Sequence, residues 1–130
     1  MNPYQSVANN YSQNVARIES SERAIALLYE GSLRFLGELD RAILKIKSGD
    51  TAQIEVKTKL INRLSEIFTE LLNMLDYDNG KEAAHYLSGL YTHQLKLLAQ
   101  INLDLDETKV AIIVKVVRGL LEAWKDVHDL

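Results

Sequence analysis

Hydrophobic residues recur at intervals of three and four along most of this chain, and that spacing places side chains on one face of an α-helix. The clearest example is the segment at 80–102, which begins at a glycine and ends at an asparagine. More apolar residues lie beside its stripe, at positions 83, 86 and 97, so we expect contacts with neighbours on more than one side. The stripe itself consists of Ala84, Leu87, Leu90, Tyr91, Leu95, Leu98 and Ile101.

The same spacing predicts three further helices, at about 22–47, 51–75 and 107–128. Turns rich in Gly, Asp and Asn separate them, at 48–50 and 76–80. Residues that typically cap helices precede each of the three segments, namely Ser20 and Ser21, then Asp50 with Gln53 three residues later, and finally Asp104 or Asp106.

The last helix contains the run VAIIVKVV, whose β-branched residues are also typical of a buried strand. Length and a hydrophobic face sustained over five turns favour a helix. This helix also has a second apolar line, where a helix with a single buried face would carry charge. The second line consists of Ile112, Val116, Ala123 and Val127.

Four helices joined by short turns predict an all-α fold, an antiparallel up-down four-helix bundle with an N-terminal amphipathic arm. The bundle is expected at 22–130 and the arm at 1–21. The arm is either a frayed tail or an amphipathic segment that lies on the bundle and can be lifted off. Its apolar residues have helical spacing: Tyr4, Val7, Tyr11, Val15 and Ile18.

Composition narrows the class of protein. A chain of 130 residues with 47% hydrophobic and 25% charged residues is typical of one globular domain. The net charge of −3, without a basic cluster, argues against binding to nucleic acid or anionic membranes. There is no cysteine, no signal-peptide pattern and no apolar stretch of about 18 residues that would insert in a membrane. We therefore expect a cytoplasmic protein.

Candidate chemistry is sparse. Glu82 and His85 form a Glu-x-x-His pair, but a di-metal site needs a second such pair, which the chain lacks. Glu66, Glu70 and Asp76 are more typical of a solvated helix face than of acid–base catalysis. No phosphate-binding loop, nucleophile elbow or zinc-binding histidine pair is present. We expect neither an enzyme nor a cofactor or metal site. Within the first predicted helix, Gly31 is expected to permit close helix–helix approach.

Four segments, in this order along the chain, resemble the flagellar secretion chaperones of the FliS type. They are LLYEG at 27–31, FTELLNMLD at 68–76, NGKEAAHYLSGLYTHQLKLLAQIN at 79–102 and RGLLEAW at 118–124. The chain departs from the family in two places. Members often have Pro after the Ser before the first helix, where this chain has Ser21-Glu22. They often end the third helix with Ala-Asn, where this chain has Ile101-Asn102.

The resemblance implies a cytoplasmic export chaperone with an N-terminal cap. Such proteins bind the disordered C-terminal segment of flagellin one to one, prevent its premature polymerisation and deliver it to the flagellar type III export apparatus. The segment would fold into short helices in apolar grooves of the bundle. Whether a co-chaperone, the export gate or an anti-sigma factor also docks is left open.

The surplus of apolar surface indicates which residues would contact a partner. In the arm, Tyr4, Tyr11 and Ile18 are expected to rest in a groove from which flagellin displaces them. Two alternatives remain: a homo-oligomeric structural bundle or adaptor without flagellin specificity, and a metal-dependent oxidase. The predicted groove residues are Leu71, Leu75, Tyr86, Leu90, Tyr91, Ile112 and Val116.

Overall fold

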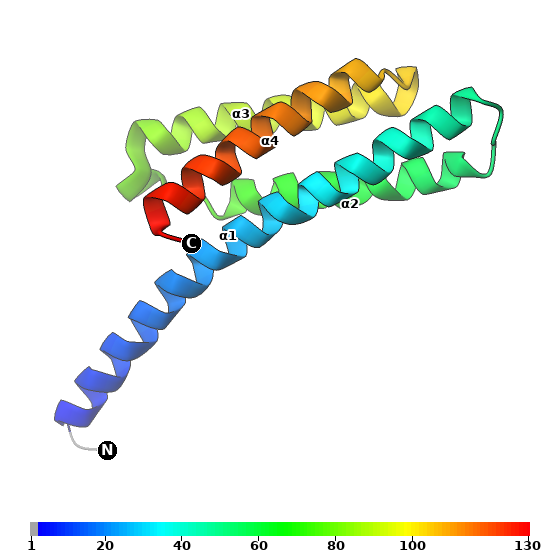
Figure 1. The fold of residues 1–130 in the computed structure, drawn as a ribbon. Helices are drawn as coiled ribbons and strands as arrows, with labels where there is room; N and C mark the ends of the chain where they lie inside the picture. Colours follow the sequence, from blue (N-terminus) through cyan, green and yellow to red (C-terminus); the bar gives the residue numbers. More distant parts are fainter. Residues whose placement is uncertain (1–2) are drawn as a thin grey trace.

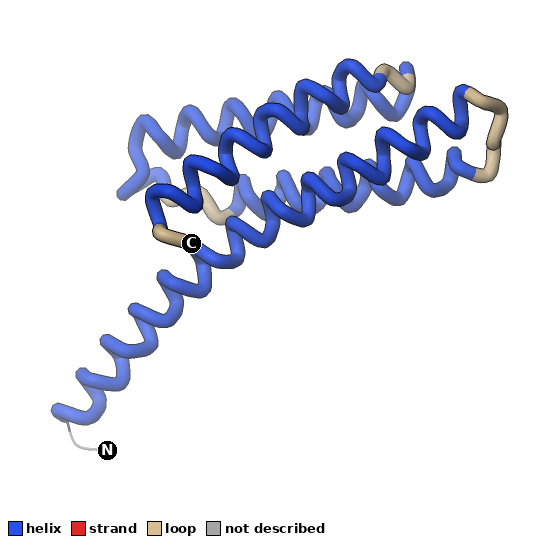
Figure 2. Tube along the Cα trace, viewed as in Figure 1, coloured by secondary structure: helices blue, strands red, loops and turns tan. Residues whose placement is uncertain are grey.

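The computed structural model describes the backbone of residues 3–130 and the side chains of Pro3 and residues 21–130. This part of the chain forms four helices, α1 (Pro3–Lys47), α2 (Gln53–Asn73), α3 (Tyr77–Asp104) and α4 (Glu107–His128). Short loops join them, and the described residues contain no strand (Figure 2). The all-α prediction is therefore confirmed.

The helices pack as an up-down bundle in which sequence neighbours are spatial neighbours. α1 contacts α2 and α4, and α3 contacts the same two helices from the other side. Figure 1 shows α3 and α4 side by side on one side of the molecule, with α1 and α2 on the other. This order places α1 and α3 on one diagonal of the bundle.

The first helix begins much earlier than predicted. It is continuous from Pro3, so Ser20 and Ser21 do not start a new helix. Proline is tolerated in the first turn of a helix, and no glycine or second proline interrupts the chain before Gly31. Figure 1 shows the N-terminal part of α1 extending in line beyond the other three helices. The predicted boundary between the arm and the bundle, at residue 21, therefore lies within one continuous helix.

The third helix also begins earlier than predicted. Asp76 caps it, since its carboxylate accepts hydrogen bonds from the backbone N–H groups of Asp78 and Asn79 at 3.1 and 3.2 Å. The Asn79 side-chain amide donates a further hydrogen bond, and these bonds lower the pKa of Asp76. A kink follows at Lys81, with φ 45° and ψ −119°. The predicted turn at 76–80 is thus a short helical turn joined to the main helix by a strained lysine.

The predicted cap is wrong for α2 and correct for α4. The Asp50–Gln53 capping box does not form, because α2 starts after Ala52 without any side-chain cap. Gly49 does adopt the left-handed conformation expected after a helix, with φ 101°. Asp106 caps α4 by accepting from the Thr108 N–H at 2.9 Å. The bounds of α4 agree with the prediction, and the β-branched run is helical.

The core lies along the bundle axis and contains one polar contact across the diagonal. The hydroxyl groups of Tyr29 on α1 and Tyr91 on α3 are hydrogen-bonded to each other, and the Phe68 ring lies 6.2 Å from that of Tyr91. Gly31 faces Ile67 of α2 with space for a methyl group, so helix approach there does not require glycine. The largest fully buried apolar side chains are Tyr29, Leu36, Leu39, Ile43, Leu64, Phe68, Leu71, Tyr91, Leu98, Ile101 and Ile113.

We expect the tyrosine pair to be strongly coupled. Tyr29→Phe or Tyr91→Phe alone leaves one buried hydroxyl without its partner, which costs about 1–3 kcal/mol of unfolding free energy. The double variant removes both hydroxyls and should cost less than the sum of the single variants. Urea unfolding followed by circular dichroism measures this, with exposed Tyr77→Phe as the control. Strictly additive costs would contradict the coupling.

The same pair predicts a loss of stability at alkaline pH. Burial raises the pKa of both hydroxyls, so the folded state keeps them protonated above the pH at which the unfolded chain ionises. The stabilisation is complete below about pH 10 and falls as pH rises further, by about 1.4 kcal/mol per pH unit for each tyrosine. The double phenylalanine variant should lack this part of the pH dependence. Unfolding titrations between pH 8 and 11 test it, and parallel curves for the two proteins would refute it.

Candidate partner-binding surface

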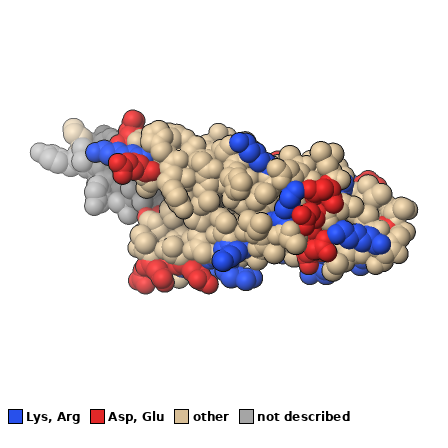
Figure 3. Space-filling model, turned by 90° about the horizontal axis from the view of Figure 1, so that it is seen from above, with Lys and Arg blue, Asp and Glu red and all other residues tan. Residues whose placement is uncertain are grey.

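α3 and α4 are the least closely packed pair of neighbouring helices in the bundle. Residues 83–95 of α3 include no Lys, Arg, Asp or Glu, and neither does the second apolar line of α4. Figure 3 looks down on this side of the molecule and shows a largely uncharged stretch in its left half, with charged groups along the edges and across the right half. An uncharged surface therefore extends over part of α3 and α4.

Large apolar side chains are exposed on this surface. Tyr86 of α3 is 69% exposed, and Ile112 and Val127 of α4 are 48% and 76% exposed. Leu90 and Val116 are half-buried. A cavity of about 390 Å³ opens between the two helices, and we call it the α3/α4 groove. It is lined by Tyr29, Ala83, Tyr86, Leu87, Leu120, Ala123, Trp124, Val127 and His128.

A second cavity, of about 220 Å³, lies beside this groove at the end of the bundle. All four helices contribute to this end cavity, and it shares Ala83, Leu87 and Trp124 with the α3/α4 groove. Three of the predicted partner residues line it, namely Leu71, Leu75 and Tyr91. The structure buries Leu71 and Tyr91 in the core rather than exposing them, because both complete the packing between helices.

Trp124 holds the shared wall of these cavities in place. Its indole Nε1–H donates to the backbone carbonyl of Glu22 on α1, at 2.8 Å. The ring of His128 lies 4.1 Å from the indole ring, and its Nδ1 is 3.1 Å from the Glu22 carboxylate. Lys125 adds an ion pair with Glu30 at 2.9 Å. The last turns of α4 are thus fixed against α1.

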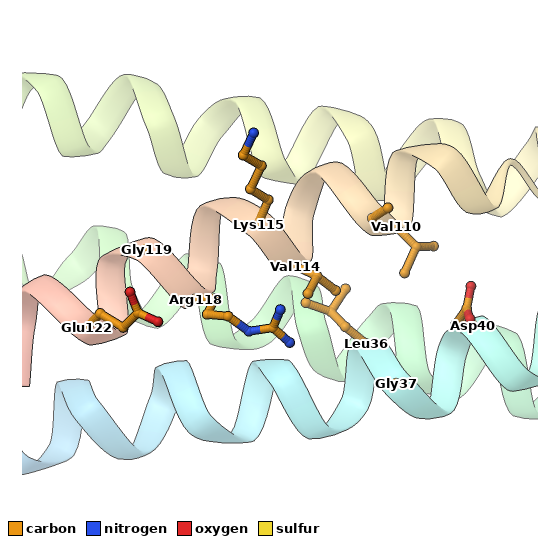
Figure 4. Close-up of a pocket in the computed structure, with 10 residues that line it drawn as sticks. Leu36, Gly37, Asp40, Val110, Val114, Lys115, Arg118, Gly119 and Glu122 are labelled. Atoms are coloured by element: carbon orange, nitrogen blue, oxygen red, sulfur yellow. The ribbon is translucent and has the colours of Figure 1, made fainter.

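A further groove, on the opposite side of α4, was not predicted from the sequence. It lies between α1 and α4, has a volume of about 670 Å³, and we call it the α1/α4 groove (Figure 4). Leu36, Val110 and Val114 supply apolar side chains to it. The signal in the sequence was the pair of glycines inside predicted helices, Gly37 and Gly119, both of which line the groove.

The other candidate residues are placed as follows. The side chains of Tyr4, Tyr11 and Ile18 lie outside the described residues, so their role stays a prediction. Glu82 and His85 are exposed, and His85 lies 5.0 Å from the Tyr77 ring. Within residues 21–130, no three His, Asp or Glu side chains gather in a way that would hold a metal ion. No helix in the described part is long and apolar enough to cross a membrane.

Comparison with known proteins gives the family. The family described as "Flagellar protein FliS" matches residues 3–130. The flagellar secretion chaperone FliS of Campylobacter jejuni is 47% identical over 121 residues, covering 93% of this chain and 90% of the relative. The protein of the same name from Salmonella typhimurium is 31% identical over 109 residues, covering 83% and 76%. The chain therefore belongs to the FliS family of flagellar secretion chaperones, which are not enzymes.

Proposed function

We propose that this protein is a cytoplasmic export chaperone for flagellin. It binds the disordered C-terminal segment of flagellin, prevents premature polymerisation and delivers the segment to the flagellar type III export apparatus. The observation that carries the proposal is the uncharged surface over α3 and α4, with Tyr86, Ile112 and Val127 exposed on it. Exposed apolar area of this kind typically marks a protein partner.

The dimensions of the surface suit a short amphipathic helix. From Ile112 to Val127, α4 extends about 22 Å, which is the length of a helix of four turns. A client helix with apolar residues at i, i+3, i+4 and i+7 would place them between Tyr86 and Leu90 on one side and the second line of α4 on the other. Residues 83–95 of α3 carry no Lys, Arg, Asp or Glu, so a client helix beside them pays no cost for desolvating charge on that side.

Folding on binding keeps the affinity moderate. A disordered segment that becomes helical on a chaperone buries on the order of 1,000–3,000 Å² and loses several kcal/mol to ordering. The complex can then be dissociated at the export apparatus without ATP hydrolysis by the chaperone. Moderate affinity is a functional advantage for a protein that must release its client.

The N-terminal arm is proposed to compete with the client. Tyr4, Tyr11 and Ile18 would occupy a groove of the free bundle until flagellin displaces them. Because α1 continues in line past the bundle in Figure 1, docking of the arm requires the helix to bend near Ser20 and Ser21. Serine side chains favour the first position of a helix. Ser20 or Ser21 would therefore cap the part of α1 that follows the bend and stays in the bundle.

Substitutions on the exposed surface should weaken flagellin binding without unfolding the chaperone. We expect Tyr86→Ser to reduce affinity for a flagellin C-terminal peptide by about 30-fold, as for an interface hot spot. Ile112→Ser should have a smaller effect of the same sign. Unfolding free energies should change by less than about 0.5 kcal/mol, because both side chains are exposed. Fluorescence anisotropy with a labelled peptide measures the affinity.

The matched control is Ile54→Ser on α2. Ile54 is 45% exposed, close to the value for Ile112, but it belongs to α2 and lines neither the α3/α4 groove nor the end cavity. Equal losses of affinity for Ile54→Ser and Ile112→Ser would contradict the proposed surface. Sizing chromatography distinguishes the proposed chaperone from the main alternative, a homo-oligomeric bundle. An oligomer in the absence of peptide, whose elution volume does not change when the peptide is added, would favour that alternative.

Deletion of residues 1–17 tests the arm. If the arm occupies the groove about 90% of the time, its removal should tighten apparent flagellin affinity by about 10-fold. The thermal midpoint of the free chaperone should fall, since the groove loses its cover. Titration calorimetry and thermal unfolding measure both quantities, and unchanged values for both would remove the arm from the mechanism.

A further inference from the structure

Lys81 lies inside α3, but its backbone does not have a helical conformation. Its φ of 45° and ψ of −119° fall in a region that glycine enters easily and other residues enter only with strain. Leu105 and Asp129 also have positive φ, but both have the ordinary left-handed conformation of a residue that ends a helix. The strain at Lys81 therefore marks a bend that the fold imposes on α3.

The adjacent glycine does not take over this bend, because it has another role. Gly80 is not among the residues with positive φ. A Cβ atom added to Gly80 would lie only 3.1 Å from that of Ala84, so the missing side chain lets the backbone approach the next turn closely. The N–H of Gly80 also donates to the backbone carbonyl of Asp76, at 2.7 Å. Gly80 thus keeps the first turn against the main part of α3, and Lys81 makes the bend.

The first turn of α3, at 77–80, is a small unit held mainly by Asp76. The Asp76 carboxylate accepts three hydrogen bonds from the turn, at 2.7, 3.1 and 3.2 Å. Tyr77 adds a contact with the main part of the helix, since its ring lies 5.0 Å from the His85 ring. Only residues 74–76 connect the turn to α2. The turn can therefore change its angle to α3 while its own hydrogen bonds stay intact.

This unit forms one side of the end cavity. Asp76 and Gly80 line the cavity, as do Leu71 and Leu87 from α2 and the main part of α3. Figure 1 shows the first turn of α3 bent away from the line of the rest of the helix. A cavity of about 220 Å³ lined mainly by apolar side chains means that packing beside the turn is incomplete. The bent turn thus combines backbone strain with incomplete packing.

We propose that the 77–80 turn is a strained flap that regulates binding of the exported client. In the bent state seen here, the flap covers one side of the end cavity. In the straight state Lys81 adopts helical φ and ψ, and α3 continues without a bend through the flap. This inference rests on the proposed function, because the client is the ligand that shifts the flap from the bent to the straight state.

The geometry of α3 explains why the client favours the straight state. Residues three and four positions apart share one face of a helix, so a straight α3 adds the flap to the face that carries Ala83 and Tyr86. In the bent state this face ends at Lys81. A ligand shifts an equilibrium only by its differential affinity for the two states. Contact with one more helical turn supplies that difference, and release of the strain at Lys81 adds to it.

The strain is tested by glycine substitution, because its effect on stability should have opposite signs at two positions of α3. Lys81→Gly should raise the thermal midpoint of the free chaperone by about 2–5 °C relative to Lys81→Ala, since glycine accepts the bent conformation. Lys96→Gly is the matched control at an exposed position of the regular part of α3. It should lower the midpoint relative to Lys96→Ala, as glycine does inside a regular helix. Differential scanning calorimetry measures all four variants.

The regulation is tested by binding of a flagellin C-terminal peptide. Lys81→Gly should bind the peptide about 5-fold more weakly than Lys81→Ala, because it stabilises the bent state that the client must straighten. Lys81→Val should bind more tightly than Lys81→Ala, since β-branched residues tolerate positive φ least. The carbon chemical shifts of Lys81 in the unaltered chaperone report its backbone conformation directly. They should be non-helical in the free protein and helical with saturating peptide.

Two results would overturn the inference while Tyr86→Ser still weakened binding, which would leave the proposed function intact. The first is a lower thermal midpoint for Lys81→Gly than for Lys81→Ala, because there would then be no strain to release. The second is equal peptide affinity for these two variants with non-helical shifts of Lys81 in the complex, which would make the turn a fixed part of the fold. Failure of the unaltered chaperone to bind the peptide would instead remove the proposed function, and the role of the flap with it.

Discussion

α4 uses only a narrow strip of its apolar surface for the core, and the arrangement of the molecule follows from this. Its fully buried side chains are Val110, Ile113 and Val117. Other apolar residues of α4 are only partly buried against the core, and several of them line the α3/α4 groove or the α1/α4 groove, among them Val114, Leu120 and Trp124. Polar contacts with α1 add to this packing. They are the hydrogen bond from Trp124 to Glu22 and the ion pair of Lys125 with Glu30, and both lie beyond Val117, the last fully buried residue of α4.

The position of the Trp124 contact also permits movement of the arm. The acceptor is the backbone carbonyl of Glu22, which lies on the bundle side of Ser20 and Ser21. A bend of α1 at the two serines would leave this carbonyl and its hydrogen bond in place. The cavity walls formed by Trp124 can therefore persist whether the arm extends from the bundle or folds back on it. In the proposed mechanism, release of the arm would therefore leave the attachment of α4 to α1 unchanged.

The sequence predicted regular features well and missed those set by tertiary context. The stripe and caps of α4 were sufficient to find its bounds, because a hydrophobic face sustained over five turns has a helical period and is longer than a typical strand. Ser20 and Ser21 led to the wrong start for the first helix. A serine can cap a helix or lie within one, and the residues around it determine which of the two occurs. The kink at Lys81 had no signal of its own, because the adjacent Gly80 is the residue expected to take an unusual conformation.

Burial was the harder quantity to predict for the candidate site. Tyr86 and Tyr91 lie five residues apart, and the sequence required only that one of them leave the core. The hydroxyl of Tyr29, across the bundle diagonal, gives Tyr91 a partner and so permits its burial. That partner is 62 residues away in the chain, beyond any local pattern. Tyr86 has no such partner among residues 21–130 and stays exposed.

The same reasoning applies to Gly37 and Gly119, whose effect depends on two helices meeting. Each glycine alone is a minor flaw in a helix, and only their convergence on one groove gives them a common explanation. A single-chain sequence contains both residues but not their proximity. Features that lower the stability of the free protein, such as these glycines, are expected where a surface is shaped for a partner rather than for its own fold.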